Sequence, residues 1–383
     1  MRLGIRRALL VGAAMLTLGG VMAAPANAVE PSDGITQTLA LGGSDTTEDV
    51  MGALAAAYNN NATYNPTPGK DNAVNVPVQA EAGSPGFTAA ADANCTQRTY
   101  VNKDEANPPT TYPAPNGSTD GKNALRGVAP FPTDNLTTGC FDAARSSSGP
   151  SSSDPAQFEY YAFGLDAVSW ARFPGNAPVS LSIQEIRDIY SCTKTNWNQV
   201  GGSAGTIIRY IPQAGSGTRS FFLGTILNNV PPSTNCGPVK EVQEHDGAAV
   251  PAADRSNAIV PFSVAQWVAQ GNGVVDDKRG GIVIGRQETT TGVLNPVSGT
   301  AGDFTPNANV VREPSTFLGV RRVYNVVDTR LPKVGQTVRF VGEDAAGPGY
   351  ICDPASGAAS IITRFGFGLL PEDPGTGSTC RIQ

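Results

Sequence analysis

The chain has 383 residues, a formal net charge of −6 and an isoelectric point near 5.0. This acidic balance argues against general nucleic-acid binding, which relies on basic surfaces, although local hydrogen-bond donors can still hold a small anion. Because 40% of the residues are hydrophobic, we expect a folded protein. The chain is longer than a single hydrophobic core usually supports, so we expect two lobes.

The first residues have the form of a removable export signal. Three arginines within the first seven residues precede an apolar run that ends near Met22, and Ala26-Asn27-Ala28 fits the small-residue cleavage rule. We therefore predict a Sec-type signal peptide at 1–28. The signal has no cysteine to carry a lipid, and no later apolar run reaches the length of a membrane span. We expect a secreted, soluble mature protein.

Six cysteines remain after the signal, and an even number in an exported chain indicates disulfides. The chain has no Cys-x-x-Cys and a single histidine, His245, which argues against a zinc site, so we predict no metal and no cofactor. Six cysteines allow 15 connectivities; we predict that sequence neighbours pair, because each bond then stays within one lobe. The predicted pairs are Cys95–Cys140, Cys192–Cys236 and Cys352–Cys380.

The mature chain opens with a strand, a glycine- and serine-rich loop and a helix, an order typical of α/β proteins. Residues 37–41 are predicted to form the strand, and Ser44, Asp45, Thr46 and Thr47 lie in the loop. The following helix has apolar residues at helical spacing and two acidic residues in its first turn, where the helix dipole favours them.

A second unit of the same kind follows. Residues 74–80 are predicted to form a strand, after which Ser84 can cap a helix that has Pro85 at its first position. Residues 94–123, rich in Pro, Thr, Asn and Gly, indicate a long surface excursion, and residues 125–130 are predicted to return to the sheet.

The middle of the chain contains a serine-rich loop and a crossing strand. Residues 145–148, Arg-Ser-Ser-Ser, fit a solvent loop as well as a binding loop. Residues 159–172 alternate in polarity and predict a long strand that crosses between lobes. Ser182 and Glu185 form a capping box, which predicts a helix that starts there.

A glycine-flanked motif, Gly215-Ser216-Gly217-Thr218-Arg219, follows a predicted strand at 206–211 and leads into a helix. Backbone N–H groups at a helix start lack partners, and glycines let an anion approach them. An ordinary capped helix explains the same residues, so the motif alone leaves both interpretations open.

The last part of the chain alternates between strands and helices. Residues 258–262 predict a strand that turns into a helix, and residues 280–285 another strand. Residues 320–327 predict a strand that crosses back to the first lobe. Residues 338–341 predict a short strand, and residues 360–365 a terminal helix.

Short motifs in the second half of the chain occur in one characteristic order: Ser182–Tyr190, Thr195–Trp197, Val200–Gly202, Gly215–Thr218, Ile259–Ser263 and Val323–Val326. In these motifs the chain resembles the substrate-binding proteins of phosphate-specific ABC importers, which belong to the type II periplasmic-binding-protein family. The resemblance implies an α/β fold of two lobes with a ligand cleft between them. The implied division is lobe 1 at 29–165, lobe 2 at 166–290, and a return to lobe 1 with a C-terminal segment at 291–383.

The resemblance also implies a function. It predicts an exported solute-binding protein, a monomer and not an enzyme, that holds phosphate or a similar oxyanion and delivers it to the permease of an ABC importer. The family's ligand loops carry over onto Ser44, Asp45, Thr46, Thr47, Ser84, Arg145, Ser146, Ser147, Ser216, Gly217, Thr218 and Arg219.

The chain departs from the family pattern at two positions. The family arginine that lies four residues before the motif serine is replaced by Pro212, and Arg219 or Arg145 can take its place. The family aspartate that accepts a hydrogen bond from protonated phosphate is replaced by a serine, and Asp45 is the candidate acid among the loop residues.

Two other functions compete with this interpretation. An exported serine hydrolase would need Ser216 as nucleophile and His245 as its sole base, but the motif lacks the outer glycine of Gly-x-Ser-x-Gly. A secreted or wall-associated protein with this fold could hold another oxyanion or no small ligand, and the altered arginine and aspartate positions favour that alternative.

Overall fold

The structure, a computed structural model, describes residues 39–65, 72–78, 87–89, 98–101 and 111–383. The predicted signal peptide at 1–28, the predicted ligand Ser84 and the predicted disulfide partner Cys95 lie outside these residues. Among the described residues, none of the helices is both long and apolar enough to cross a membrane.

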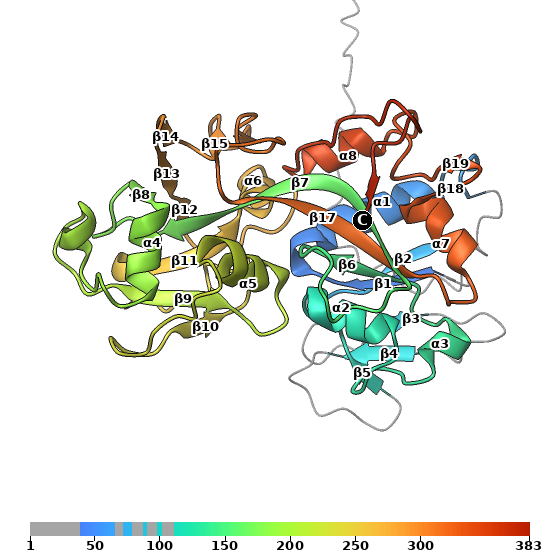
Figure 1. The fold of residues 1–383 in the computed structure, drawn as a ribbon, viewed down its shortest axis with the longest axis horizontal. Helices are drawn as coiled ribbons and strands as arrows, with labels where there is room; N and C mark the ends of the chain where they lie inside the picture. Colours follow the sequence, from blue (N-terminus) through green and yellow to red (C-terminus); the bar gives the residue numbers. More distant parts are fainter. Residues whose placement is uncertain (1–38, 66–71, 79–86, 90–97, 102–110) are drawn as a thin grey trace, which may run out of the picture.

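The fold is α/β with two lobes (Figure 1). Parallel strands form the centre of each lobe, and their residues are almost all buried, as expected for strands that are covered on both faces. The strands of the first lobe are β1 (Leu39–Gly43), β2 (Ala73–Asn75) and β6 (Ala143–Ser146). The strands of the second lobe are β9 (Ile208–Pro212), β10 (Lys240–Val242) and β11 (Ala258–Ser263).

Two long antiparallel strands, β7 (Phe158–Arg172) and β17 (Val320–Asp328), join the lobes. The first ten residues of β7 pair with β17, and its last residues, 168–172, pair with β11 of the second lobe. Strand β17 in turn pairs with β6 of the first lobe. The result is one continuous sheet in the order β10-β9-β11-β7-β17-β6-β1-β2, and both predicted crossing strands are confirmed.

Helices pack on both faces of this sheet. The first lobe contains η1 (Asp45–Thr47), α1 (Glu48–Asn59), α2 (Ser118–Leu125), α3 (Asn135–Thr138), α7 (Val334–Val341) and α8 (Ala358–Arg364). The second lobe contains α4 (Ile183–Tyr190), η2 (Trp197–Val200), α5 (Gly217–Phe221), which continues as a π-helical turn η3 (Phe222–Ile226), η4 (Arg255–Asn257) and α6 (Val264–Gly271).

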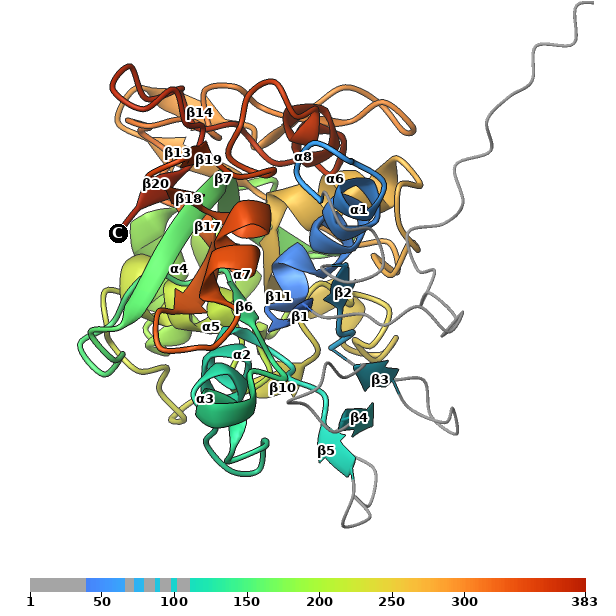
Figure 2. The ribbon, with the colours of Figure 1, turned by 90° about the vertical axis from the view of Figure 1, so that its right-hand side faces the viewer.

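Short strands complete the fold. A small separate sheet, formed by β3 (Phe87–Ala89), β4 (Arg98–Val101) and β5 (Thr111–Pro113), lies at the edge of the first lobe (Figure 2). The remaining strands are β8 (Ser180–Ser182), β12 (Val283–Ile284), β13 (Arg286–Thr289), β14 (Gly292–Leu294), β15 (Val297–Ser298), β16 (Thr305–Pro306), β18 (Glu343–Asp344), β19 (Gly347–Pro348) and β20 (Arg381–Ile382).

The apolar pattern of the sequence accounts for the cores. The predicted apolar face of α1 is confirmed, because Val50, Leu54 and Tyr58 are fully buried in the first lobe. The capping box at Ser182 and Glu185 is also confirmed at the start of α4, whose apolar residues pack in the second lobe. Burial of such side chains stabilises the fold by about 1.5–3 kcal/mol each.

Three predicted elements differ from the structure. Residues 338–341 were predicted as a strand but belong to helix α7, whose buried residues Thr337, Val338, Phe340 and Val341 recur at helical spacing. Residues 125–130 end helix α2 and form a turn instead of returning to the sheet. After Pro85, the residues that follow form strand β3 and not a helix.

Two of the predicted disulfides are confirmed. Cys192 bonds to Cys236 within the second lobe, and Cys352 bonds to Cys380 in the C-terminal segment. Cys140 is disulfide-bonded as well, and its predicted partner lies outside the described residues. Closing loops of 44 and 28 residues contributes about 4 kcal/mol each to stability on the chain-entropy estimate.

Candidate functional site between the lobes

The carboxyl ends of the parallel strands of both lobes meet between the lobes (Figure 1). Ser44 follows β1 and Ser147 follows β6 in the first lobe, while the Gly215–Thr218 motif follows β9 and Glu244 follows β10 in the second. Ligands of open α/β sheets bind at such strand ends. The order of the strands therefore brings loops that are far apart in sequence to one place.

Four hydroxyl groups form a buried cluster at this place, which we call the hydroxyl cluster: Ser44, Thr46 and Ser147 of the first lobe and Thr218 of the second. All four residues are fully buried. Thr46 Oγ1 lies 3.2 Å from Thr218 Oγ1 and 3.3 Å from Ser147 Oγ, and Ser44 Oγ donates to Ser147 Oγ over 2.9 Å. The two lobes are therefore in direct polar contact.

An arginine from the crossing strand β17 lies against the hydroxyl cluster. Arg321 Nη2 donates to Thr218 Oγ1 over 2.9 Å and to Thr46 Oγ1 over 3.2 Å, and Nη1 donates to the Ser147 carbonyl over 3.1 Å. No sequence motif identified Arg321. It contacts residues of both lobes, so a change in the distance between the lobes would alter its hydrogen bonds.

Asp166 on β7 holds Arg321 in position. The sheet register places the two residues opposite each other, and Arg321 Nε and Nη2 donate to Asp166 Oδ2 over 3.0 and 2.7 Å. The other oxygen, Oδ1, accepts from Ser263 Oγ and from the Ala265 N–H at the start of α6. Because this buried pair is fully hydrogen-bonded, it can orient the guanidinium without the cost of an unpaired charge.

His245 adds a further donor to the hydroxyl cluster. Its Nε2 lies 3.0 Å from Thr46 Oγ1, and its Nδ1 accepts from the Ser263 N–H over 3.4 Å. A backbone N–H can only donate, so Nδ1 is unprotonated and the neutral ring carries its hydrogen on Nε2. Burial, together with the charge of Arg321, holds the pKa of His245 well below its usual value. The ring is therefore neutral and donates to Thr46.

Two glycines allow the lobes to approach closely. A Cβ on Gly217 would lie 2.3 Å from Ser147 Oγ and 2.4 Å from Ser118 Oγ, and a Cβ on Gly117 would lie 2.4 Å from the Gly215 carbonyl. Gly117 also has a φ of 128°, which favours glycine. The start of α2 therefore forms part of this contact, although it was predicted to belong to a surface excursion.

Comparison with known proteins places the chain in a family. A model of the PBP superfamily domain matches residues 28–306. The chain belongs to the PBP superfamily. None of the curated proteins compared with it matches.

Solved structures share the fold of this PBP-superfamily chain. An ABC-type phosphate transport receptor from Vibrio cholerae is 16% identical with a TM-score of 0.50, and the match covers 87% of this chain and 100% of that one. The ancestral soluble variant of the human phosphate binding protein is 13% identical with a TM-score of 0.50, and the match covers 86% of this chain and 90% of that one. These likenesses show the type II periplasmic-binding-protein fold that the sequence predicted.

The two arginines predicted for the site of this PBP chain do not contact the hydroxyl groups of the cluster in this structure. Arg145 is fully buried inside the first lobe, where Nε donates to the Ser44 carbonyl and Nη1 to the Val76 carbonyl. Arg219 donates to the Pro212 carbonyl and pairs with Glu241 at the surface. Arg321, and neither of these two, is the arginine at the hydroxyl cluster.

The other predicted residues divide between the cluster and its surroundings. Ser216 Oγ caps α5 and donates to Glu244 Oε2, not to His245. Ser146 Oγ donates to the Ser148 carbonyl. Thr47 is buried beside the cluster, and among the described residues its Oγ1 has no hydrogen-bond partner.

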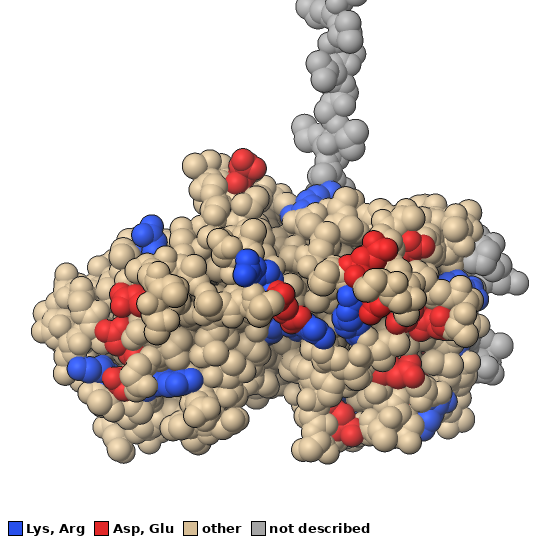
Figure 3. All heavy atoms as spheres, turned by 45° about the horizontal axis from the view of Figure 1, so that its top comes forward, with Lys and Arg blue, Asp and Glu red and all other residues tan. Residues whose placement is uncertain are grey.

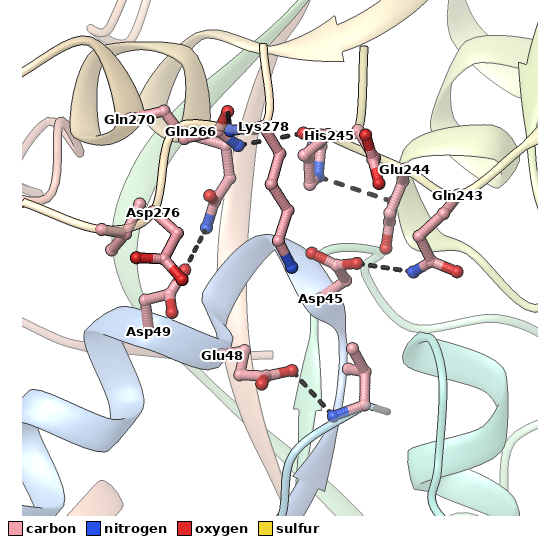
Figure 4. A pocket seen from close by; sticks show the side chains of 13 residues that line it. Asp45, Glu48, Asp49, Gln243, Glu244, His245, Gln266, Gln270, Asp276 and Lys278 are labelled. Atoms are coloured by element: carbon pink, nitrogen blue, oxygen red, sulfur yellow. Dashed lines mark hydrogen bonds and ion pairs between the residues drawn. The ribbon is translucent and has the colours of Figure 1, made fainter. Parts of the chain in front are cut away.

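A second polar site, the acidic pocket, adjoins the hydroxyl cluster (Figure 4). It has a volume of about 110 Å³ and is lined in part by Glu244 and His245. His245 also contacts Thr46 of the hydroxyl cluster, and Thr218 of the cluster lies near enough to the Glu244 carboxyl to counteract part of the rise in its pKa that burial causes. Asp45, predicted as an anion ligand, lines the pocket and accepts a hydrogen bond from Gln243 over 2.7 Å. The carboxyl residues that line it are Asp45, Glu48, Asp49, Glu244, Asp246 and Asp276, and the one lysine is Lys278.

Burial raises the pKa values of four of these carboxyl groups, those of Asp45, Glu48, Asp49 and Glu244. Burial, followed by the negative charge of Glu244, raises the pKa of Asp45 well above its usual value. Burial raises the pKa of Glu48 to about 7 against the opposing effect of Arg145. Burial also raises the pKa values of Asp49 and Glu244. The pocket therefore favours protons or another positive charge.

Proposed function

We propose that this protein binds inorganic phosphate between its lobes and, after export, delivers it to the permease of an ABC importer. The observation that carries this proposal is the position of Arg321, whose guanidinium meets buried hydroxyls of both lobes at once. The family and its structural neighbours are binding proteins rather than enzymes, and one neighbour is described as a phosphate transport receptor.

The donors at this place match the chemistry of an oxyanion. Arg321 supplies charge-assisted hydrogen bonds, which are about twice as strong as neutral ones, and Thr46, Ser147 and Thr218 supply hydroxyls. Gly217 starts α5, where the backbone N–H groups and the helix dipole favour negative charge. An anion bound by these groups loses its hydrogen bonds to water and gains hydrogen bonds to fixed donors of the protein.

Binding requires the lobes to separate and close again. In the structure Thr46 and Thr218 contact each other directly, so an anion between them must enter a more open form. Strands β7 and β17 connect the lobes and supply Asp166 and Arg321, so the arginine stays at the junction during such a movement. A ligand bonded from both sides favours the closed form by its differential contacts.

The chemistry of His245 and Ser216 favours binding over hydrolysis. A general base must accept a proton, but His245 Nε2 already carries one because Nδ1 faces the Ser263 N–H. Ser216 Oγ is engaged by Glu244 and by the start of α5. We therefore propose a binding protein without turnover, exported by the signal at 1–28, monomeric, and divided into lobes at 29–165, 166–290 and 291–383.

Calorimetric titration with phosphate tests the proposal. The protein should bind phosphate saturably, and Thr218→Val should weaken binding about 10- to 100-fold, because one hydrogen bond to a charged group contributes about 1.5–3 kcal/mol. Thr234→Val changes an exposed threonine of the same lobe and should leave the affinity unchanged. Absence of phosphate binding, or equal loss in both variants, would overturn the proposal.

A further inference from the structure

The acidic pocket has far more carboxyl groups than cationic groups for its size. Its walls contain six carboxyl residues and one lysine. Glu48 also lies 3.6 Å from Arg145 Nη2, whereas Arg321 pairs with Asp166. The hydroxyl cluster therefore has a neighbour that is rich in acceptors for a positively charged group.

Two carboxyl groups at the boundary between the pocket and the hydroxyl cluster approach each other from opposite lobes. Ligand atoms of Asp45, Glu244 and His245 lie within 4.8 Å of one another, and Figure 4 shows the carboxyl groups of Asp45 and Glu244 turned toward each other. Glu244 is only 2% exposed. Among the described residues its Oε1 makes no hydrogen bond of normal geometry, although the Thr218 hydroxyl and N–H lie near enough to the carboxyl to counteract part of the rise in its pKa that burial causes. A buried carboxyl oxygen without such a bond calls for a donor.

The geometry favours an ammonium group over a metal ion as that donor. A metal would need the lone pair of His245 Nε2, but this atom carries the ring hydrogen and donates to Thr46. That leaves Asp45 and Glu244, fewer ligands than Ca²⁺ or Zn²⁺ takes. An ammonium needs only acceptors, and Lys278 already extends its own ammonium into the pocket (Figure 4), where its charge opposes the burial that raises the pKa values of Glu48 and Asp49.

We infer that the site accepts a phosphate monoester of a short primary amine, with the phosphate at the hydroxyl cluster and the ammonium between Asp45 and Glu244. This inference rests on the proposed phosphate site and extends it to a ligand that carries both charges. The two halves share the walls formed by Glu244 and His245, so a two-carbon linker can join them. Inorganic phosphate occupies only the first half.

Titration with a matched pair of ligands tests the inference. Phosphoethanolamine carries the amine, and ethyl phosphate has a hydrogen atom in place of the ammonium group at the end of the same two-carbon linker. The protein should bind phosphoethanolamine at least about tenfold more tightly, the effect expected for one charge-assisted contact. Asp45→Asn should reduce this difference to about twofold, because it weakens the binding of phosphoethanolamine and does not weaken the binding of ethyl phosphate.

Two further variants distinguish an effect on ammonium binding from a general loss of the folded protein. Lys278→Met removes the competing ammonium and should increase the preference for phosphoethanolamine. Glu241→Gln changes an acid whose side chain is 54% exposed and should leave the preference unchanged. If phosphate and ethyl phosphate bind but phosphoethanolamine binds no better, the inference is wrong and the phosphate site stands. If none of the three binds, the proposed function fails and the inference fails with it.

Discussion

Replacing Arg321 by lysine separates its role in anion binding from its role in the fold. The guanidinium makes two hydrogen bonds to Asp166 and donates to Thr46, Thr218 and the Ser147 carbonyl. A lysine keeps the charge but has one nitrogen in place of a planar fork, so it can hold Asp166 or reach the cluster but not both. We expect it to stay with Asp166, because an unpaired buried carboxylate costs several kcal/mol.

The variant should therefore fold but lose the arginine's contact with the anion. Loss of one charge-assisted hydrogen bond costs about 1.5–3 kcal/mol, which corresponds to phosphate binding about 10- to 100-fold weaker. Calorimetric titration gives the affinity, and thermal melting confirms that the variant is folded. The matched control is Arg219→Lys at the surface of the second lobe, which should bind phosphate as the parent does. Equal phosphate affinities for Arg321→Lys and the parent would refute the reasoning.

Three other predictions follow from the same geometry. Gly217→Ala should weaken phosphate binding about tenfold without unfolding the protein, because its Cβ would meet Ser147 Oγ at 2.3 Å and keep the lobes apart; titration and melting of the variant check both parts. The folded state keeps Glu48 protonated up to about pH 7, whereas the free carboxyl ionises near 4.5. The resulting stability is fully present below pH 4.5 and is lost as the pH rises through 7, amounting to about 3 kcal/mol; urea unfolding should show this loss for the parent, and Glu48→Gln should not share it. Replacing both Cys192 and Cys236 by serine should lower the free energy of unfolding by about 4 kcal/mol in urea unfolding, and an unchanged midpoint would contradict the entropy argument.

Short sequence patterns were sufficient to predict the main strands and helices of the fold. The long alternation at residues 159–172 identified β7, and the Ser182–Glu185 capping box identified the start of α4. Both signals depend on neighbours in the chain. The error at α7 has the same origin, because four residues, 338–341, are too short to separate helical spacing from alternation.

The hydroxyls of the candidate site could be predicted, but its arginine could not. Ser44, Thr46, Ser147 and Thr218 follow strand ends, and parallel strands bring such ends together. Arg321 comes from the middle of a crossing strand, where only the register opposite Asp166 places it at the cluster. One signal was available: Asp166 lies between Leu165 and Ala167 in the buried part of β7, and a buried charged residue needs a partner.

Charge patterns did not identify the acidic pocket. Its carboxyl groups come from η1 and the start of α1, the loop after β10 and the loop after α6, so they are divided over three separate stretches of the sequence. Over the face in Figure 3, lysine and arginine side chains lie scattered among acidic ones. Only the closed arrangement of the lobes brings Asp45 and Glu244 together, and this depends on contacts such as that between Thr46 and Thr218.

A crystal structure of the protein grown with phosphate should show the anion between the lobes. We expect it within hydrogen-bond distance of the Arg321 guanidinium, the Thr218 hydroxyl and a hydroxyl of the first lobe. An anion bound at Arg145 or Arg219, or no anion between the lobes at saturating phosphate, would show that the proposed site is wrong.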